Sequence, residues 1–517
     1  MTDTLTVFAR TQSERPAIID DRPHGTLVCW TFAELEANVN RLARVFRNWG
    51  AKPRDKIIWC GPNSPWVVAA GMAARKIGAV EVPLNYRFTE KEAAYVVDNS
   101  DAVLVFTDAE HAGLFAKIKE RIAKVKHVLV FDGAPLDGQV AASTLIEAAD
   151  PSAISSEVET DDSGTMIYTS GTTGKPKGAV RQGDRDPNWA DNLIELFRYR
   201  SEDVYLTTGP LYHSGPSAFM AIAFALGNTT VLQRKFDAQD WLRLVDKYRV
   251  SSTFSAPTPM RLVTQLPEAT FANYDVSSLR VLVANAAPWS FALKKAFLAK
   301  FPNDCLFEAY GSTELGVNTI LRPEDQLRKP GSCGQVAPGV EIVLFDDHGN
   351  AVSQPHRPGE VFIRSASVFT TYHKAHDKFE ADRRGDLHTV GDIAFFDEEG
   401  YYYICDRKND MIISGGVNIY PAEIEAVLEQ VDEVLDVAVF GIPSDQWGES
   451  VHAAVVKRTG SNVDAKTLES FARKHLAGYK VPKSFEFVAE IPHTGTGKIL
   501  KRKLREPYWK DHTFKVC

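Results

Sequence analysis

The stretch Tyr168-Thr-Ser-Gly-Thr-Thr-Gly-Lys-Pro-Lys-Gly178 follows directly on the short apolar run Thr165-Met-Ile167. It contains three glycines, four hydroxyl residues and two lysines. Glycines permit backbone turns that are closed to other residues, so successive N–H groups can point at one anion while hydroxyl and ammonium groups complete its shell. The stretch therefore predicts a loop that holds phosphate.

The spacing of the glycines argues against one kind of phosphate site. A Walker loop requires the pattern G-x-x-x-x-G-K-[ST]. Here two residues separate Gly171 from Gly174, and Lys175 is followed by Pro176 instead of a hydroxyl residue that binds magnesium. A GTPase or kinase-like loop does not fit this pattern. A flexible surface loop is the competing interpretation, which the rest of the chain has to decide.

Four further motifs follow this loop along the chain. They are Tyr310-Gly-Ser-Thr-Glu314, Thr389-Val-Gly-Asp392, Asp406-Arg-Lys408 and Gly495-Thr-Gly-Lys498. In their order and separation, the five motifs resemble the adenylate-forming superfamily of acyl-CoA synthetases, luciferases and peptide-synthetase adenylation domains. The resemblance covers nearly the whole chain. Because five such motifs would rarely occur together by chance, it favours a phosphate loop over a flexible surface loop.

The resemblance implies an α/β fold with two domains joined by a hinge. The N-terminal AMP-binding domain (residues 1–405) would contain two doubly wound αβα sheets and a small β layer. A polar hinge (residues 406–410) would carry a small, mobile α+β C-terminal domain (residues 411–517) that closes over the active site.

Local patterns agree with this architecture. A capping box at Thr31 and Glu34 opens a helix whose apolar stripe stops at Gly50. Strands that alternate with helices predict largely parallel sheets with helices on both faces. The expected strands of the first part are residues 56–60, 79–83, 103–106, 127–131, 229–232, 279–284 and 306–309, with helices at 66–77, 238–248 and 290–301.

The pattern changes in the last third of the chain. Strands at residues 340–345, 359–364 and 401–405 follow one another without long helices, which indicates a β-rich layer. Beyond residue 410 the sequence predicts a separate α+β unit, with helices at 422–431 and 466–476 and strands at 434–442, 452–457 and 484–488.

Composition excludes several classes of protein. With 59 basic and 67 acidic residues the formal net charge is -8, which does not favour a nucleic acid as partner. The six cysteines include no C-x-x-C pair, so they indicate thiols in a reducing compartment. The N-terminus has neither the basic start nor the apolar core of a signal peptide, and the apolar stretch from Trp66 to Val80 is interrupted by Arg75 and Lys76. We expect a cytoplasmic protein, a monomer or homodimer without a transmembrane segment; peripheral membrane contact stays open.

The residue types suit a reaction without a covalent enzyme intermediate. A carboxylate is a poor electrophile, and attack on the α-phosphate of ATP turns it into an acyl-adenylate that a thiol can then attack. The protein then has to supply positioning and neutralisation of charge. The sequence contains no G-x-S-x-G elbow and no evident Cys/His pairing that would indicate nucleophilic catalysis. The resemblance implies ATP, Mg2+ and coenzyme A as cofactor and cosubstrates.

The resemblance assigns the phosphate contacts. It places the β- and γ-phosphates against Thr169, Ser170, Gly171, Thr172, Thr173, Gly174 and Lys177. Thr313 would contact the α-phosphate, and Glu314 would bind the magnesium ion, for which a carboxylate oxygen is a suitable ligand.

The resemblance also assigns the nucleoside contacts. Asp392 would accept both ribose hydroxyls, Arg407 would add a ribose or phosphate contact, and Tyr310 would stack on or flank the adenine. The remaining members of the implied nucleotide site are Asn285, Ala286, Ala287, Gly311, Ser312 and Ile404.

Lys498 is the residue on which the implied chemistry depends most. In the resembling family, a lysine in Pro-x-x-x-x-Gly-Lys near the C-terminus enters the active site and bonds the attacking carboxylate and the bridging oxygen of the adenylate. A cation there favours the transition state, because charge on the transferring phosphate rises as pyrophosphate leaves. The competing interpretation is one more cation in the basic segment from Lys498 to Arg505.

The acyl and coenzyme A sites rest on weaker patterns. Pro210-Leu-Tyr-His213 resembles the segment that lines the carboxylate site. The implied acyl pocket consists of Tyr212, His213, Ala284, Gly311 and Val317, with Asn285 and Ala286 beside it. Coenzyme A would approach Ser414, Gly415, Gly416 and Lys483.

Three positions depart from the family pattern. Asn285 stands where relatives commonly place glycine, Asn409 holds the hinge position where aspartate or lysine is usual, and Gly183 falls where many relatives have histidine. These departures leave the phosphate chemistry intact and weaken any transfer of substrate identity.

The sequence therefore predicts an ATP-dependent acyl-CoA synthetase. A medium- or long-chain fatty acid is the expected substrate, because Asp410-Met-Ile-Ile-Ser-Gly-Gly416, Tyr420-Pro-Ala-Glu423 and Trp447-Gly-Glu449 resemble fatty-acyl and aryl-CoA ligases. An aryl or alicyclic acid is the alternative, since Tyr212, Trp189 and Asn285 could shape a flat pocket. A carrier-loading adenylation enzyme and a non-catalytic binding protein are alternatives of other classes.

Overall fold

The first long helix forms as the capping box predicts. In the computed structural model, α2 (Phe32–Asn48) starts after Thr31, whose hydroxyl accepts from the Glu34 backbone N–H at 3.2 Å, while the Glu34 carboxylate accepts from the Thr31 N–H at 2.8 Å. The helix ends because Gly50, at φ +90°, turns the chain into the left-handed region. The structure describes residues 3–510 except 24, 155–162, 170–174, 183–188, 288, 303, 409, 416 and 494–498.

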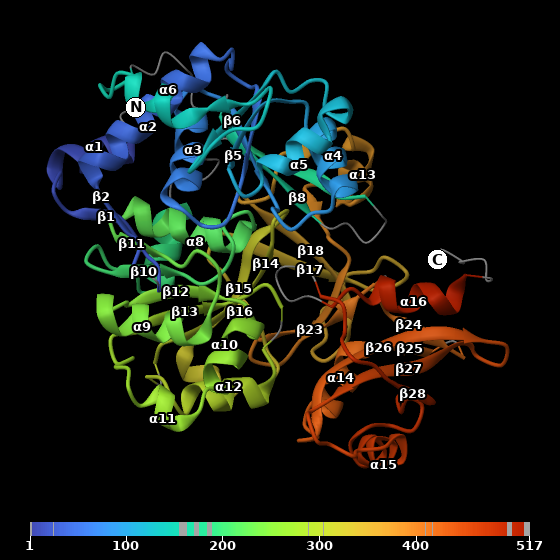
Figure 1. The fold of residues 1–517 in the computed structure, drawn as a ribbon. Coiled ribbons are helices and arrows are strands. Elements are labelled where there is room, and N and C mark those ends of the chain that lie inside the picture. Colours follow the sequence, from blue (N-terminus) through green and yellow to red (C-terminus); the bar gives the residue numbers. More distant parts are fainter. Residues whose placement is uncertain are drawn as a thin grey trace.

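The chain forms a large body and a smaller C-terminal one beside it (Figure 1). One sheet of the large body has the strand order β19-β9-β8-β4-β3-β5-β6-β7. Its strands are β3 (Lys56–Cys60), β4 (Val80–Leu84), β5 (Ala102–Asp108), β6 (His127–Phe131), β7 (Val140–Ala141), β8 (Gly164–Thr169), β9 (Lys177–Gln182) and β19 (Thr371–Tyr372). Strands β3 to β6 are parallel, as predicted. Strand β8 pairs antiparallel with β9, so the phosphate stretch connects the two strands of a hairpin.

A second sheet of nine strands has the order β16-β15-β14-β13-β12-β10-β11-β1-β2. Its strands are β1 (Pro16–Asp21), β2 (Leu27–Thr31), β10 (Val204–Thr207), β11 (Thr229–Leu232), β12 (Ser252–Ser255), β13 (Val281–Ala284), β14 (Leu306–Ser312), β15 (Gly316–Leu321) and β16 (Gln335–Val336). Strand β1 pairs parallel with β11, which brings the N-terminus to this sheet.

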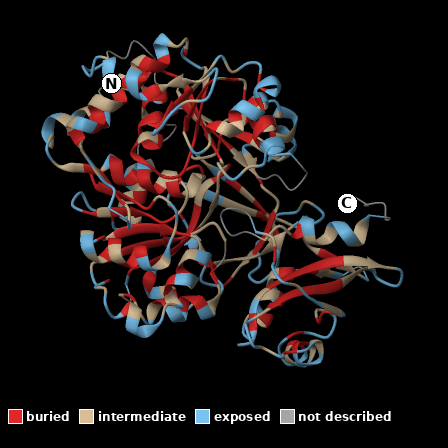
Figure 2. Ribbon diagram, viewed as in Figure 1, coloured by how far each residue is buried: buried red, intermediate tan, exposed pale blue. Residues whose placement is uncertain are grey.

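Helices cover both sheets and fill the space between them. They are α1 (Thr4–Thr11), α3 (Pro65–Lys76), α4 (Glu90–Asn99), α5 (Ala112–Lys117), α6 (Ala142–Ala148), α7 (Trp189–Leu196), α8 (Ser214–Ala225), α9 (Ala238–Tyr248), α10 (Pro257–Thr264), α11 (Glu268–Phe271), α12 (Phe291–Leu298) and α13 (His376–Ala381). Side chains from α2, α3 and α8 and from strands of both sheets share one apolar core, seen as the buried interior in Figure 2. Within the described residues, no helix has both the length and the apolar character of a bilayer span.

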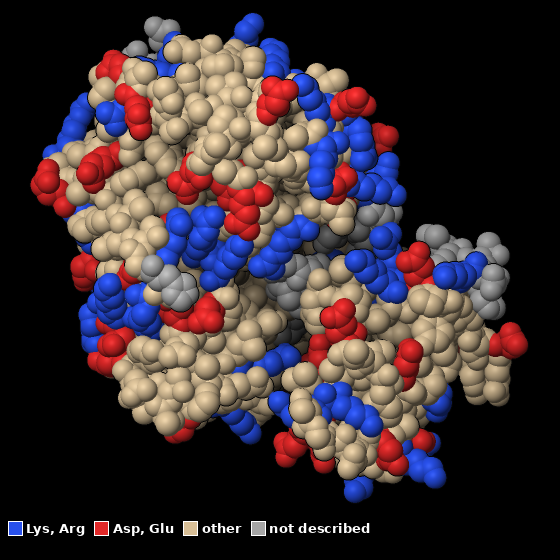
Figure 3. Space-filling view, viewed as in Figure 1, with Lys and Arg blue, Asp and Glu red and all other residues tan. Residues whose placement is uncertain are grey.

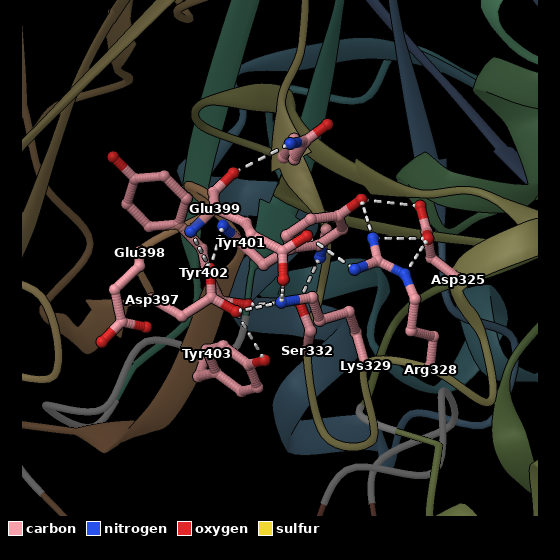
Figure 4. Close-up of polar contacts among 12 residues, drawn as sticks. Asp325, Arg328, Lys329, Ser332, Asp397, Glu398, Glu399, Tyr401, Tyr402 and Tyr403 are labelled. Carbon is pink, nitrogen blue, oxygen red and sulfur yellow. Dashed lines mark hydrogen bonds and ion pairs between the residues drawn. The ribbon is translucent and has the colours of Figure 1, made fainter.

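A third, mostly antiparallel sheet confirms the predicted β layer. It consists of β17 (Val340–Phe345), β18 (Gly359–Ser365), β20 (Arg383–Arg384), β21 (Leu387–His388), β22 (Asp392–Phe396) and β23 (Tyr402–Arg407). Hydrogen bonds and ion pairs connect the turn between β22 and β23 to the segment after β15 (Figure 4). Lys329 lies 2.7 Å from Asp397, and Arg328 donates to Glu399 at 2.6 Å and to the Tyr401 hydroxyl at 2.8 Å.

The smaller body is the predicted α+β unit. Its sheet joins β24 (Ile412–Ser414), β25 (Val417–Ile419), β26 (Val434–Ser444), β27 (Gly448–Lys457) and β28 (Ser484–Phe487), and its helices are α14 (Pro421–Leu428), α15 (Ala465–His475) and α16 (Lys501–Trp509). It has an apolar core of its own around Ile424, Val439 and Val455. The α/β fold class expected from the sequence is thereby confirmed.

Candidate active site

A long cleft runs between the large body and the smaller one. Both sheets, the β layer and the small body contribute to its walls. Figure 3 shows it as a hollow with lysine and arginine side chains along one edge. Basic residues that line it include Arg87, Lys91, Lys175, Arg234, Lys235 and Lys408, and acidic residues line other parts of it. The basic side chains along this edge suit a polyanionic ligand.

Glu314 lies in the part of the cleft where the sequence predicts the phosphates. Its Oε1 accepts hydrogen bonds from the hydroxyls of Thr169 and Tyr372, each at 3.0 Å. Thr169 ends β8 and faces Lys177 across the hairpin, so the strand pairing brings the motif at 168–178 to the motif at 310–314. Burial, and next the neighbouring Lys378, lowers the pKa of Lys177. An anionic ligand would relieve that unfavourable environment.

The carboxylate of Glu314 fits the magnesium role that the sequence implies. Both hydrogen bonds found within the described residues go to Oε1, which leaves Oε2 for a cation. The side chain is buried and opens on the cleft beside two hydroxyl groups, so the donor set is of hard oxygens.

Thr313 is held from two sides. Its hydroxyl lies 2.7 Å from that of Ser214, the first residue of α8, and its carbonyl oxygen accepts from Arg181 at 2.7 Å. The second guanidinium nitrogen of Arg181 donates to the Ser367 carbonyl at 2.6 Å. These contacts fix the loop that carries Thr313 and Glu314 before any ligand binds.

Asp392 connects the motifs expected to bind the nucleoside. Its Oδ2 accepts from the Tyr310 hydroxyl at 2.7 Å, and its Oδ1 lies 3.3 Å from Arg407 Nε. Burial and the nearby Asp392 raise the pKa of Tyr310, so the phenol stays protonated. Burial disfavours the charge of Arg407, but Asp392 and Asp410 outweigh it and raise the guanidinium pKa. The two residues therefore hold the Asp392 carboxylate in place at the cleft wall.

The segment around Asn285 forms the facing wall. Asn285 donates to the Ala309 carbonyl at 2.6 Å and accepts from the Ala286 N–H, and Ala286 has φ +75°. Gly311 lies opposite, where an added Cβ would come within 2.1 Å of the Gly316 carbonyl oxygen. The Asn285 side chain, which the sequence left as an unexplained departure, thus connects the end of β13 to the middle of β14. Other predicted nucleotide residues that line the cleft are Ala287, Ser312 and Ile404.

The side of the cleft where the sequence predicts the acyl group follows α8. His213 is the N-cap residue of this helix and lines the cleft with Tyr212 and Val317. Tyr86, which the sequence did not single out, meets the Tyr212 ring edge to face at 5.5 Å. Further apolar lining comes from α8 and α3, namely Phe219, Met220, Phe224, Val67, Val68 and Met72.

Ala284 does not line the cleft. It ends β13 and is buried in the core with Trp241 and Phe297. Strand side chains alternate between faces, so its neighbour Asn285 reaches the cleft instead. Ala284 is therefore not part of the acyl pocket, contrary to the prediction from the sequence.

The small body carries two sets of predicted site residues, Lys498 and the coenzyme A residues, and within the described part of the chain only the surroundings of Lys498 line the cleft. His493 and Ile499, which pair across the base of the segment that contains Lys498, line it. Of the predicted coenzyme A residues, Ser414, Gly415 and Lys483 are not among its lining residues. Gly415 lies against the Trp447 ring, and Lys483 donates to the Gly478 carbonyl at 3.4 Å.

Several predicted positions lie outside the described residues. They are Gly183, Asn409, Gly416, Lys498 and the loop residues Ser170, Gly171, Thr172, Thr173 and Gly174, together with the Trp189 side chain. Sequence reasoning missed Ser214, Arg181 and Tyr372. Only their proximity to Thr313 and Glu314 reveals them, because none belongs to a motif.

Comparison with known proteins gives the family. A family model described as AMP-binding enzyme matches residues 5–373, and one described as AMP-binding enzyme C-terminal domain matches residues 423–498. Feruloyl-CoA synthase of Amycolatopsis sp is 34% identical over 496 residues, covering 94% of this chain and 96% of the relative. Long-chain-fatty-acid–CoA ligase FadD13 of Mycobacterium tuberculosis is 34% identical over 484 residues, covering 93% and 94%.

The fold agrees with these matches. The crystal structure of ATP-bound MatB from Rhodopseudomonas palustris has a TM-score of 0.85 and 27% identity to this chain, and the match covers 98% of this chain and 99% of that one. The chain therefore belongs to the AMP-binding enzyme family of the adenylate-forming superfamily and is an AMP-forming acid–thiol ligase.

Proposed function

We propose that this ligase activates a medium- or long-chain fatty acid as its acyl-adenylate, releasing pyrophosphate, and then transfers the acyl group to the thiol of coenzyme A. ATP and coenzyme A are its substrates. One observation carries the proposal. The hydrogen-bonded carboxylates of Glu314 and Asp392 and an apolar wall along α8 all line the same cleft.

In the first step, a carboxylate oxygen of the acid attacks the α-phosphorus and the bond to pyrophosphate breaks. Thr313 would donate to the α-phosphate, Asp392 would hold the ribose hydroxyls, and Lys177 would neutralise the outer phosphates. A magnesium ion bound at Glu314 would supply further neutralisation of phosphate charge. Lys498 would stabilise the charge that develops on the transferring phosphate.

In the second step, the thiolate of coenzyme A attacks the acyl carbonyl and AMP leaves. We infer that the small domain (residues 411–517) rotates against the large one (residues 1–405) between the steps, about a hinge at residues 406–410 that includes Asn409. The placement of Ser414, Gly415 and Lys483 away from the cleft lining supports such a rotation, because the implied coenzyme A residues have to reach the adenylate.

The length of the apolar wall supports a fatty acid. The α8 helix has 12 residues, which corresponds to about 18 Å, and all of them except Ile222 and Ala223 line the cleft. An extended acyl chain bound at His213 could run along this helix and bury its methylene groups against α3, each contributing about 0.8 kcal/mol.

An aryl acid is the second candidate. The edge-to-face pair of Tyr86 and Tyr212 gives the carboxylate end an aromatic wall that suits a flat ring. The curated relatives include both a feruloyl-CoA synthase and a fatty-acid ligase at 34% identity, so identity does not rank the two acids. A role in fatty acid metabolism, the cytoplasmic location and the monomeric or homodimeric state stay predictions.

The test is acid-dependent pyrophosphate release from the purified protein over a panel of saturated fatty acids, aryl acids and alicyclic acids, each with and without coenzyme A. The proposal expects release with medium- and long-chain acids, and thioester formation once coenzyme A is added. Activity confined to ring acids would show that the substrate is an aryl or alicyclic acid instead of a fatty acid. Transfer only to a carrier protein would contradict coenzyme A as the acceptor, and no release with any acid would contradict the ligase assignment itself.

A further inference from the structure

Asp406 makes contacts that cross the expected hinge. It belongs to β23 of the large body and is the first residue of the expected hinge, and its Oδ2 accepts from the Ala422 N–H of α14 at 3.0 Å. Within the described residues Tyr420, the N-cap residue of α14, makes no side-chain capping bond. The carboxylate of Asp406 thus serves as the cap of a small-domain helix, where negative charge is favoured.

Lys501 adds a second contact across the hinge. It is the first residue of α16, its side chain is 9% exposed, and its Nζ lies 3.7 Å from Asp406 Oδ2 and 3.0 Å from Glu425 Oε1. Glu425 is on α14 and also accepts from the Val439 N–H at 2.7 Å. A buried ammonium group requires such partners, because removing them leaves an uncompensated charge.

These contacts differ in whether a domain rotation can preserve them. The pair of Lys501 and Glu425 lies wholly within the small body and turns with it. The two contacts of Asp406 join residues on opposite sides of Asn409, so a rotation about that position must break both. Lys501 would keep Glu425 as a partner after its contact with Asp406 is broken. The rotation therefore leaves no buried ammonium group without a partner.

We infer that Asp406 and Lys501 form a latch, with Asp406 as a positioning residue, that holds the small domain in the orientation where His493 and Ile499, which flank the segment containing Lys498, line the cleft. The inference rests on the rotation described under the proposed function. Its Lys501 lies three residues after Lys498, so the latch anchors the C-terminal side of that segment directly to β23. The latch favours the adenylate-forming orientation and has to open before thioester formation.

The test measures the orientation without any substrate. Spin labels on cysteines at exposed Ala272 and Lys474, one on each body, report the distance distribution in the full-length protein after Cys29 and Cys517 are replaced by serine. Asp406→Asn and Lys501→Met are each expected to change the ratio of the two distance populations by about fivefold or more, in favour of the second distance. Lys501→Arg should restore the original distribution, and Lys503→Met, an exposed change on the same helix, should leave it unaltered.

A kinetic comparison uses dodecanoic acid as the probe. Lys501→Met is expected to slow acid-dependent pyrophosphate release by about fivefold more than thioester formation from dodecanoyl-adenylate. Unchanged distance distributions in both Asp406→Asn and Lys501→Met would overturn the latch while the ligase assignment stands. A variant that merely destabilises the fold would lower the melting temperature and both rates together, and so would also count against it.

Discussion

The hydroxyl of Tyr310 donates to Oδ2 of Asp392 at 2.7 Å. The two residues are 82 positions apart in the chain and come from different sheets, the nine-stranded one and the β layer. With Arg407 at the other oxygen of Asp392, this contact joins three of the motifs found in the sequence into one wall of the cleft, where we propose that the ribose binds.

Asp392→Asn should raise the KM for ATP. Loss of a charged acceptor costs about 1.5–3 kcal/mol, so an increase of about tenfold or more is expected in a pyrophosphate-release assay. Tyr310→Phe should have a smaller effect, because Arg407 still orients the carboxylate. Tyr401→Phe is the matched control: it removes a tyrosine–aspartate hydrogen bond of 2.7 Å from the same part of the fold, at Asp325. A KM that changes as much in the control as in Asp392→Asn would remove the ribose assignment.

Lys498→Ala should abolish acyl-adenylate formation and spare thioester formation from preformed adenylate. The cation is needed where charge rises on the transferring phosphate, which happens in the first half-reaction. The two half-reactions are measured separately, by acid-dependent release of pyrophosphate and by consumption of the acyl-adenylate with coenzyme A. Lys503→Met, a nearby basic residue, should affect neither; equal loss of both half-reactions in Lys498→Ala would refute the role.

Ala218→Trp should shorten the range of acids used. Ala218 lies on α8 and lines the cleft, so an indole there would occupy the path of a long chain. We expect kcat/KM to fall by about tenfold or more for long acids, the equivalent of about two methylene groups, and to change little for short ones. Ala218→Ser, which adds a single oxygen atom, is the control. Uniform loss across all chain lengths would show that the chain does not follow α8.

Glu425→Gln should change how stability depends on pH. Burial raises the pKa of Glu425 to about 7 from its ordinary value of 4.5, against the opposing effect of Lys501. The folded protein therefore binds a proton that the unfolded chain has lost, so the stability gained from this carboxyl is complete below pH 4.5 and is lost as pH rises to about 7.

Glutamine cannot ionise, so the melting temperature of Glu425→Gln relative to the parent protein should rise between pH 5 and pH 8. Thermal unfolding in a series of buffers measures this difference. Glu433→Gln, at an exposed position of the same body, should give a constant difference. A constant difference for Glu425→Gln as well would mean that this carboxyl keeps its ordinary pKa.

The sequence by itself determined the elements whose cause is local. The capping box at Thr31 and Glu34 fixed the start of α2, and strand–helix alternation predicted the parallel strands β3 to β6. The phosphate stretch, read together with the four later motifs, indicated the family. These signals lie within a few neighbouring residues, so spacing and residue type are enough to read them.

Only the tertiary structure decided which distant residues meet. No sequence pattern predicts that β1 pairs with β11, that Tyr372 donates to Glu314, or that Asp406 caps α14. Strand pairing and side-chain contacts of this kind depend on packing between segments far apart in the chain. The same reason explains Ala284: the alternation of β13 places its side chain in the core, and the neighbouring Asn285 lines the cleft instead.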